Sequence, residues 1–265
     1  MITRVRLSPV VIAIIAWTSF SLTFARNFTI YNACPFTIWP AIYTDLKVGT
    51  ALPSPNNVTG WEAPPWSTRS FEIPDNWRAG RIWGRRDCDF SKGSGPNSCL
   101  TGSCIGTGLN CDLQIGTGVP PATVAEWTLE GENGVDHYDV SLVDGYNLPM
   151  RITNNKGCPI AECAIDLSPT CPAPLRGPTD SNGWVTGCMS SCFANLTGNP
   201  ANSKDCCSGE YDTPATCPYQ NVDYYWYFKG NCPNAYAYAY DEFSGTALWT
   251  CLGSLKADYT LTFCP

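Results

Sequence analysis

Histidine is nearly absent from this chain of 265 residues, which contains His137 alone. A single histidine cannot supply the multi-histidine sites of many zinc enzymes. It also leaves a Ser-His-Asp triad with one candidate base, and a histidine on the polar face of a strand is more often structural than catalytic. Acid–base chemistry in this chain would therefore have to rest on carboxylates.

Long apolar runs are missing after the N-terminus, where no stretch approaches the ~18 residues of a membrane-spanning helix. The first 25 residues differ, because basic MITRVR is followed by apolar VVIAIIAW and then by Thr23-Phe24-Ala25. This order is typical of a cleaved secretory signal peptide, and an uncleaved N-terminal anchor fits the short apolar run less well. We predict a signal peptide over residues 1–25 and a soluble, secreted chain that begins at Arg26.

Basic residues are the minority, since 16 Lys and Arg stand against 23 Asp and Glu, giving a formal charge of −7. Removal of residues 1–25 would take away Arg4 and Arg6 and no acid, so the charge would become −9. An acidic chain is poorly suited to nucleic acid or to an anionic membrane surface. We expect neither partner, and the composition suits a neutral polysaccharide or a cation.

Cysteine, by contrast, is abundant, with sixteen residues, all after the predicted signal peptide. In an exported protein this even number indicates up to eight disulfides. Spacings such as Cys99 to Cys104 resemble metal motifs, but the oxidising compartment and the single histidine argue against a metal, and we expect no cofactor. Glycosylation sequons at Asn27, Asn57 and Asn195 fit the same compartment, and Asn57 has the most loop-like context.

Short alternating segments separated by turns dominate the chain. Predicted strands include NFTIYNA, FTIWPAIY, RSFEI, GRIWGR, much of residues 122–153, NAYAYAYDEF and DYTLTFCP. Two stretches favour helices: TGCMSSCFANLT, where Cys188 and Cys192 are spaced i, i+4, and VDYYWYFKG, which ends on Gly230. The pattern predicts a mainly β protein, a sandwich with inserted cysteine-rich loops.

The segment EWTLEGENGVDHYDVSLVD carries six carboxylates in what its alternation predicts to be a hairpin. Trp127 falls on the buried face, whereas Glu126 and Asp139 fall on the polar face. With the turn centred in GENG, Glu126 lies opposite Asp139 with their Cβ atoms about 4.5–5.5 Å apart. Asp144 follows, just before a glycine whose turn would direct it to the same place. Such close carboxylates cannot both ionise freely, which suits a glycosidase, although a solvated polar face is the alternative.

Several motifs together resemble the thaumatin-like proteins of the pathogenesis-related 5 type: GRIWGRRDCDF, SCLTGSC, PPATVAEWTL, YDVSLVDGYNLPM, DCCSG, NCPNAYAYAYDE and the closing TFCP. These motifs extend over the chain from Gly80 to its end and agree with the cysteine count. The resemblance implies one thaumatin-like domain over residues 26–265. Its parts would be an antiparallel β-sandwich core (26–85, 122–164 and 233–265), a small loop lobe (86–121) and a disulfide-rich lobe with short helices (165–232).

The same resemblance implies a definite disulfide pairing. It joins Cys34 to Cys264, Cys88 to Cys99, Cys104 to Cys111, Cys158 to Cys251, Cys163 to Cys232, Cys171 to Cys188, Cys192 to Cys206, and Cys207 to Cys217. The first of these ties the two ends of the chain together and closes the longest loop. It is therefore expected to stabilise the fold most, by roughly 4–5 kcal/mol.

An inter-lobe cleft lined by an arginine and four acids is usual in the family. Matching motif by motif assigns these positions to Arg81, Glu126, Asp139 and Asp144, whereas Asn234 stands where the family often has the remaining acid. This departure predicts a cleft less negative by one charge and further disfavours a metal or strongly cationic ligand. Ser103 also replaces an aspartate that is usual in the family, and we expect only a structural consequence there.

Members of the family bind β-1,3-glucans, and some hydrolyse them weakly. The resemblance thus implies a monomer that binds β-1,3-glucan or another cell-wall polysaccharide in the apoplast or cell wall. In an endo-β-1,3-glucanase, Glu126 would be the proton donor and Asp144 or Asp139 the base or nucleophile. Arg81 would keep the neighbouring carboxylate ionised.

A non-catalytic protein is the alternative. The AYAYAY segment would place Tyr236, Tyr238 and Tyr240 on one face, and Tyr146 follows Asp144. In a binding protein these rings would stack on sugar. The alternative is that the tyrosines are half-buried core, which is the more common role of such a stripe. An antifungal defence protein is also compatible with the sequence, but the acidic charge argues against direct attack on anionic lipid. The chain also lacks the basic surface on which sweet taste in the family depends. Both plant defence and remodelling of a fungus's own wall fit the sequence.

Overall fold

The computed structural model describes residues 25–48, 58–93, 95–104, 106–112 and 118–265. The first of its two large sheets consists of β1 (Ala25–Asn32), β3 (Thr68–Pro74), β10 (Met150–Asn154), β11 (Ala161–Cys163) and β13 (Tyr259–Phe263). The second consists of β2 (Trp39–Thr44), β4 (Gly80–Cys88), β5 (Cys99–Thr101), β8 (Val124–Thr128), β9 (Val135–Ser141) and β12 (Trp249–Leu252). β6 (Gly106–Thr107) and β7 (Asn110–Cys111) form a separate pair.

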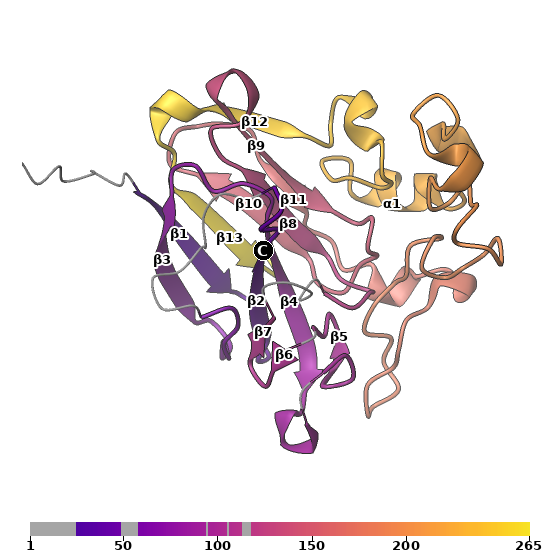
Figure 1. Ribbon diagram of the computed structural model, residues 1–265. Coiled ribbons are helices and arrows are strands. Elements are labelled where there is room, and N and C mark those ends of the chain that lie inside the picture. Colours follow the sequence, from indigo (N-terminus) through magenta and orange to yellow (C-terminus); the bar gives the residue numbers. More distant parts are fainter. Residues whose placement is uncertain (1–24, 49–57, 94, 105, 113–117) are drawn as a thin grey trace, which may run out of the picture.

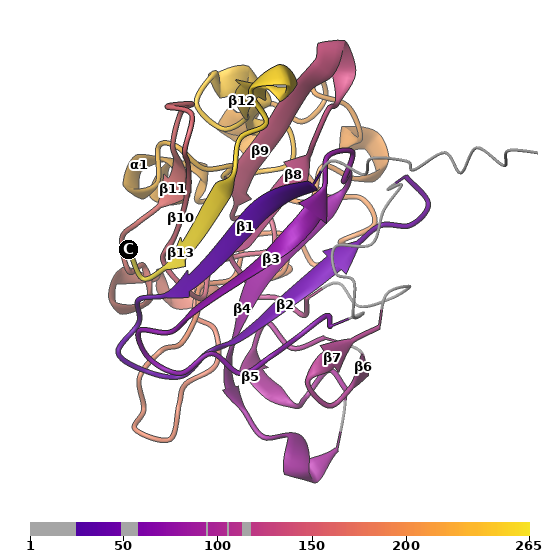
Figure 2. The same ribbon diagram turned by 90° about the vertical axis from the view of Figure 1, so that its left-hand side faces the viewer.

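The two sheets pack face to face as a sandwich (Figure 1; Figure 2). The strand order is β11-β10-β13-β1-β3 in the first sheet and β12-β9-β8-β4-β2 in the second, with β5 beside β4. The pairing of β1 with β13 is parallel, and the other pairings between described strands are antiparallel. The prediction of a mainly β sandwich is confirmed, with this parallel pair at the centre of one sheet.

The short helices lie mostly outside the sandwich. α1 (Tyr225–Asn231) begins within VDYYWYFKG, where a helix was predicted, and it ends one residue beyond Gly230. The remaining helical segments are 3-10 turns: η1 (Phe90–Lys92), η2 (Glu132–Gly134), η3 (Ser168–Thr170), η4 (Ala173–Leu175), η5 (Gly209–Tyr211), η6 (Tyr219–Asn221), η7 (Asp241–Ser244) and η8 (Gly253–Leu255). The segment that contains η3 to η6 and α1 lies across the second sheet from the first (Figure 1).

Two predicted elements are wrong. Residues 186–197 form a bridge and successive turns in place of a helix, and Asn195 has a φ of 52°. NAYAYAYDEF is not a strand, because the Asp241 carboxylate accepts the backbone N–H of Ala237 at 2.8 Å and the chain folds back into η7. In both places local side-chain and disulfide geometry overrides the spacing pattern.

Aromatic side chains fill the space between the sheets. Trp77 and Trp127 are 0% and 2% exposed. Phe28 of β1 meets both of their rings, with centroids 5.6 Å and 5.2 Å away, in edge-to-face contacts. Each such buried ring removes about 150–250 Å² from water, so this cluster supplies much of the driving force for folding.

All eight disulfides form with the pairing that the resemblance implied. Cys34–Cys264 spans 230 residues and joins the end of the first sheet to the C-terminus. Within residues 165–232, which we call the cysteine-rich segment, three bridges close loops of 17, 14 and 10 residues. Bridges of this number fit an extracellular protein.

Arg26 of β1 is a buried cation at the edge of the sandwich, with 1% of its surface exposed. Its guanidinium contacts the buried carboxylate of Asp136 and lies 3.1 Å from Asp75 Oδ1. The hydroxyl of Tyr259 also donates to Asp136, at 2.9 Å. Because these charges are buried together, removal of one would leave the others uncompensated.

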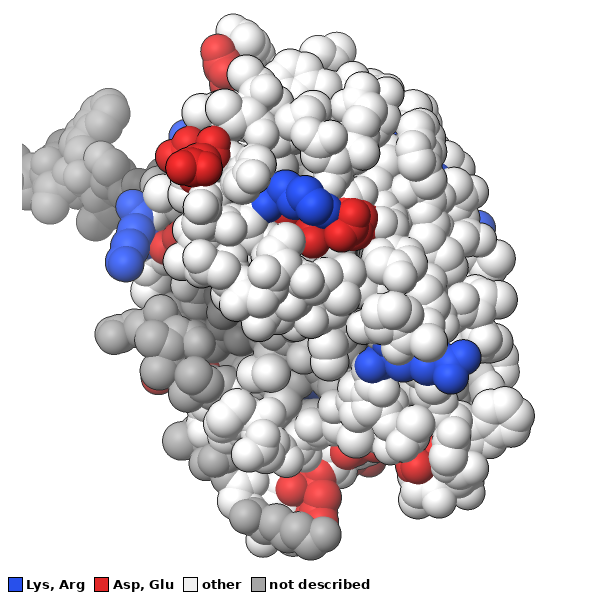
Figure 3. All heavy atoms as spheres, turned by 90° about the vertical axis from the view of Figure 1, so that its right-hand side faces the viewer, with Lys and Arg blue, Asp and Glu red and all other residues white. Residues whose placement is uncertain are grey.

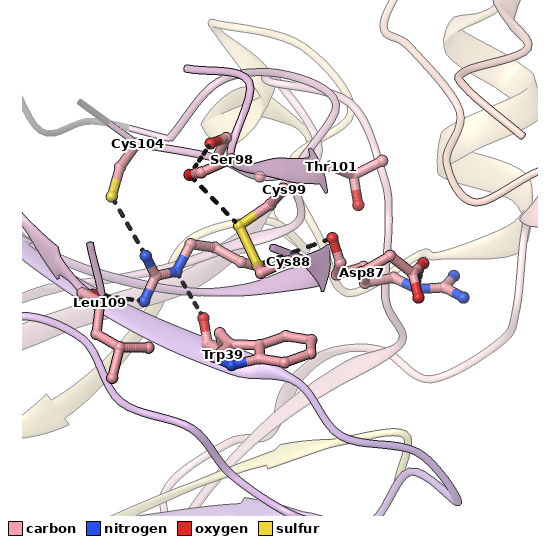
Figure 4. Close-up of a disulfide and its surroundings, with 12 residues drawn as sticks. Trp39, Asp87, Cys88, Ser98, Cys99, Thr101, Cys104 and Leu109 are labelled. Atoms are coloured by element: carbon pink, nitrogen blue, oxygen red, sulfur yellow. Dashed lines mark hydrogen bonds and ion pairs between the residues drawn. A yellow bond between two sulfur atoms is a disulfide. The ribbon is translucent and has the colours of Figure 1, made fainter. Parts of the chain in front are cut away.

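Arg85 of β4 anchors the loops after β4 without relying on a carboxylate. Its Nε donates to the carbonyl of Trp39 at 2.9 Å and its Nη2 to that of Leu109 at 2.7 Å, close to the Cys88–Cys99 bridge (Figure 4). Burial lowers the pKa of Arg85 to about 10. Nearby, the Ser103 hydroxyl donates to the carbonyl of Gly95 at 2.9 Å, a structural contact of the kind expected there.

The predicted signal peptide and Asn57 lie outside the described residues, apart from Ala25. The side chains of Asn27 and Asn195 are exposed, so both sequons are sterically open. In the part of the chain that the structure describes, no helix is long and apolar enough to span a bilayer.

Candidate functional site

Three of the predicted site residues form a row across neighbouring strands of the second sheet. Arg81 of β4 pairs with Glu126 of β8, and Glu126 pairs with Asp139 of β9. The predicted hairpin register is thus confirmed. Trp127, one residue along from Glu126, is 2% exposed and packs between the sheets. The alternation of the strands therefore turns the row toward the outer face.

Asp144 reaches the same place through the turn that follows β9. The N–H of Gly145 donates to the carbonyl of Leu142 at 2.9 Å, and Gly145 has a φ of +85°, which favours glycine. The carbonyl of Asp144 accepts the N–H of Ala122, which fixes the turn. Gly145 therefore lets the chain turn where the sequence predicted it.

These four side chains line one cleft of about 520 Å³, which we call the acidic cleft. Its other lining residues are Ala79, Gly80, Trp127, Thr128, His137, Ser141, Val143, Tyr236, Ala239, Glu242 and Leu248. The floor comes from β4, β8 and β9, and the segment before β12 forms a wall. The cleft is large enough for a chain of small polar rings.

Two of the residues predicted for this site lie elsewhere. Tyr146 is 0% exposed and belongs to the core, where its hydroxyl donates to the Ile165 carbonyl at 3.1 Å. Asn234 is not among the cleft-lining residues; its carbonyl accepts the indole N–H of Trp249 at 3.1 Å. Tyr236 does line the cleft, and the backbone bridge to β9 through Val140 and Leu142 holds it there.

Glu242 is a charged cleft residue that the sequence analysis did not assign to the site. It belongs to η7, which was mistaken for a continuing strand, and its side chain is exposed. It contributes to the rise in the pKa of Tyr236, behind burial and Asp139, so its charge is felt inside the cleft. With Glu242, four carboxylates line the cleft of this chain, and the expectation that Asn234 makes it less negative than is usual in the family stays a prediction.

One ion pair dominates the floor of the cleft. Arg81 Nε lies 2.6 Å from Glu126 Oε1, and the two side chains are 39% and 29% exposed. Burial lowers the pKa of Arg81, but Glu126, Asp144 and Asp139 outweigh it and raise the pKa overall. Arg81 is thus a fixed cation among acids.

The acids themselves are pushed toward their protonated forms. Burial raises the pKa of Glu126 against the opposing charge of Arg81, and Asp144 raises it further. Asp139 is 8% exposed, and burial together with Glu126 raises its pKa well above the usual range. Burial also raises the pKa of Asp144, again against Arg81. Since one cation faces several acids, the cluster retains a proton to a higher pH than free carboxylates do.

Asp139 has the least satisfied carboxylate of the group, because its Oδ1 atom is buried without a hydrogen-bond partner. An ionised oxygen in that position would carry a large desolvation penalty. A proton on Asp139 would lower that penalty, which agrees in direction with the raised pKa of this carboxyl group, whereas Glu126 is the more exposed acid of the pair.

Charged side chains are few on the face of the molecule that carries the cysteine-rich segment. Figure 3 shows the face on the side of the cysteine-rich segment, where a basic side chain lies directly against acidic ones near the centre and most of the surrounding surface is uncharged. Among the described residues, no group of three histidine, cysteine or acidic side chains is arranged to hold a metal ion. The acidic and basic side chains of the cleft lining are four carboxylates, Arg81 and His137.

The chain matches the model of the thaumatin family over residues 32–265. It is 40% identical over 253 residues to pathogenesis-related protein 5 of Arabidopsis thaliana, and the match covers 94% of each chain. It is 42% identical to pathogenesis-related thaumatin-like protein 3.5 of Cryptomeria japonica, with 91% of this chain and 90% of that one covered.

A solved structure shares the fold at low sequence identity. It is the family 64 laminaripentaose-producing β-1,3-glucanase of Paenibacillus barengoltzii, with 13% identity, a TM-score of 0.52, and coverage of 92% of this chain and 75% of that one. With the family model, the two relatives and the sandwich in agreement, the chain belongs to the thaumatin family, whose pathogenesis-related members it resembles along almost its whole length.

Proposed function

We propose that this protein is a secreted, monomeric β-1,3-glucan-binding protein and that its acidic cleft cleaves the bound chain slowly. The observation that carries the proposal is the row of Arg81, Glu126 and Asp139 at the floor of a cleft, with raised pKa values for both acids. The mostly uncharged surface suits a neutral polymer (Figure 3). The glucanase with the same fold supports the choice of β-1,3-glucan as the first polymer to test.

Hydrolysis in this cleft would use two carboxyl groups in opposite protonation states. Glu126 is the more exposed member of the Glu126–Asp139 pair and would give its proton to the glycosidic oxygen as the C–O bond breaks. Asp144, which is nearer to solvent than Asp139, would act ionised. It would either take the proton of the water that attacks the sugar carbon, or bond to that carbon and form a glycosyl ester that water then hydrolyses. The raised pKa of the pair keeps a proton available in mildly acid solution.

The ion pair with Arg81 explains why cleavage should be slow. At 2.6 Å the guanidinium favours ionised Glu126 and so reduces the fraction of molecules with a proton on that residue. Binding does not need this proton. We therefore expect retention of the polymer to be easy to detect and release of new reducing ends to be weak.

The test combines a pull-down on insoluble β-1,3-glucan with an assay for new reducing ends from the linear polymer. Glu126→Gln keeps the size and the hydrogen-bonding capacity of the side chain but removes the proton. We expect it to abolish cleavage, by at least 100-fold, and to leave retention within about twofold. Glu162→Gln alters a comparable cross-strand Glu–Arg pair, with Arg151, outside the acidic cleft, so it is the matched control and should cleave like the parent.

A purely binding protein is the second candidate, and the same short Arg81–Glu126 contact favours it. In that case the parent would retain glucan without releasing reducing ends at any pH between 4 and 7. If the parent neither binds nor cleaves β-1,3-glucan, both candidates are wrong.

A further inference from the structure

A second cleft, separate from the acidic one, has aromatic side chains at six of its twelve lining residues. It has a volume of about 480 Å³, and we call it the aromatic cleft. Its lining consists of Tyr219, Tyr225, Trp226, Lys229, Gly230, Pro233, Tyr238, Tyr240, Asp241, Phe243, Ser244 and Thr246. The rings come from η6, α1, η7 and the segment between α1 and η7.

Two of these rings are unusually open to solvent. Trp226 of α1 is 66% exposed and Phe243 of η7 is 74% exposed. Exposed large apolar side chains are ordinary when single, but here they border one concave surface together with half-buried Tyr219 and Tyr240. Grouped exposure of this kind marks a binding surface.

The rings are held in place before any ligand arrives. Trp226 packs against Tyr219 and Tyr225, with centroids 5.6 Å and 5.1 Å away, both edge to face. Tyr225 in turn meets Tyr238 at 5.5 Å and donates its hydroxyl to Asp241 at 2.8 Å. The indole face of Trp226 is therefore fixed, so a ligand would pay little for ordering it.

The charges in this cleft cancel one another. Lys229 Nζ lies 3.0 Å from Asp241 Oδ2 and donates to the carbonyl of Ala235 at 3.0 Å. The same carboxylate accepts the N–H of Ala237. The remaining polar groups are hydroxyls, including those of Ser244 and Thr246. Flat apolar faces beside neutral hydroxyls match the surface of a neutral sugar ring, which has C–H groups on its faces and hydroxyls at its edge.

The two clefts share a wall. Residues Tyr236, Ala239 and Glu242 line the acidic cleft, whereas Tyr238, Tyr240 and Phe243 line the aromatic cleft. The tyrosines of AYAYAY therefore do not share the one face that the alternation predicted: Tyr236 lines the acidic cleft, and Tyr238 and Tyr240 line the aromatic cleft. A chain long enough to occupy both clefts would have to cross η7, because residues of this turn line both.

We propose that the aromatic cleft is a second subsite for the same neutral glucan chain, where Trp226 and Phe243 stack on sugar rings beyond the acidic cleft. This inference depends on the function proposed above only for the identity of the sugar. Since two linked contacts raise the effective affinity for a polymer without any new chemistry, the aromatic cleft would serve retention and not cleavage.

The experiment compares Trp226→Ala with Trp66→Ala, a control on a tryptophan of nearly equal exposure, 62%, in the loop before β3. Binding to laminarin and to insoluble β-1,3-glucan is measured, together with the tryptophan fluorescence of the parent on addition of laminarihexaose. We expect Trp226→Ala to weaken polymer binding about tenfold, Trp226→Tyr to restore most of it, and Trp66→Ala to bind like the parent.

The outcomes separate this inference from the function proposed for the acidic cleft. If Trp226→Ala retains the polymer as well as the parent does, the aromatic subsite is wrong while glucan binding in the acidic cleft stands. If Arg81→Ala abolishes cleavage but laminarihexaose still changes the tryptophan fluorescence, and Trp226→Ala removes that change, the subsite stands alone. Dimerisation of the parent that Trp226→Ala abolishes, without any sugar effect, would show that this surface binds protein and would overturn the proposal, as would a parent that binds no glucan.

Discussion

Between the two sheets, Trp77 and Trp127 are almost completely buried, and the chain there is held by apolar contact. The cysteine-rich segment lies beside this sandwich and is built in another way. Of the twelve largest fully buried side chains among the described residues, Phe228 alone belongs to it. Three internal disulfides and a fourth to Cys163 constrain it in place of a large core.

The difference shows how one chain can support two kinds of surface. A sandwich with a packed core supplies a rigid floor, on which Glu126 and Asp139 are fixed by strand register. A bridged segment with little core can present Trp226 to solvent at little cost in stability, because bridges constrain its unfolded state. The acidic cleft thus lies on the packed sandwich, whereas the aromatic cleft depends in part on the disulfide-bridged segment.

The largest expected effect comes from the bridge that closes the sandwich. Replacement of Cys34 and Cys264 by serine frees a loop of 230 residues and should lower the free energy of unfolding by about 5 kcal/mol. Removal of Cys207–Cys217, which closes 10 residues, should cost about 3 kcal/mol and act on the cysteine-rich segment. Urea unfolding followed by hydrogen exchange would resolve both, and equal losses spread over the whole chain would contradict the comparison.

Removal of a large side chain should destabilise the sandwich more than the cysteine-rich segment. Trp127→Ala leaves a cavity between the sheets and should cost about 3–5 kcal/mol. Phe193→Ala, in the cysteine-rich segment, removes a ring that is 45% exposed and should change stability by less than about 0.5 kcal/mol. Thermal unfolding of both variants is the measurement. A large loss in Phe193→Ala would mean that the segment depends on apolar packing after all.

The smallest expected effect is a dependence of stability on pH. Asp139 has a raised pKa in the folded protein, so the folded state holds its proton at a pH where the unfolded chain has lost it. This acid is therefore neutral for stability in strong acid, and it destabilises the fold increasingly as the pH rises above the unfolded pKa of about 4. Asp139→Asn should raise the melting temperature at pH 7 and leave it unchanged at pH 3.

A matched variant sharpens that test. Asp180→Asn alters an acid of the cysteine-rich segment whose pKa is lowered by the backbone N–H of Trp184, so any change should run in the opposite direction. If Asp139→Asn gives no gain at pH 7, the carboxyl group is ionised in the fold and another group holds the proton of the cleft.

Sequence patterns were sufficient for much of the cleft floor. The alternation around Glu126 and the GENG turn specified its partner Asp139, because a slip of one residue would have turned Trp127 outward. They failed where a single side chain redirects the backbone. Asp241 captures the N–H of Ala237 and ends the apparent strand, so Glu242 and Phe243 turn toward different clefts.

Other features depend on contacts between distant residues, which periodicity does not record. Cys188 and Cys192 have helical spacing, yet they form disulfides with Cys171 and Cys206. Both disulfides form without a helix between Cys188 and Cys192. Tyr146 follows the cleft acid Asp144 closely but is turned into the core. The disulfide pairing itself came from the family resemblance, since spacing alone leaves it open.

Arg26 carries a practical consequence for anyone who produces this protein. Its guanidinium is the buried counter-ion of Asp136, yet it stands one residue beyond the predicted leader. Recombinant versions trimmed to Asn27 would leave a carboxylate without its cation and should express poorly, whereas an added N-terminal tag ahead of Arg26 should be tolerated, because Ala25 is exposed. The first residue to keep is therefore set by electrostatics inside the sandwich.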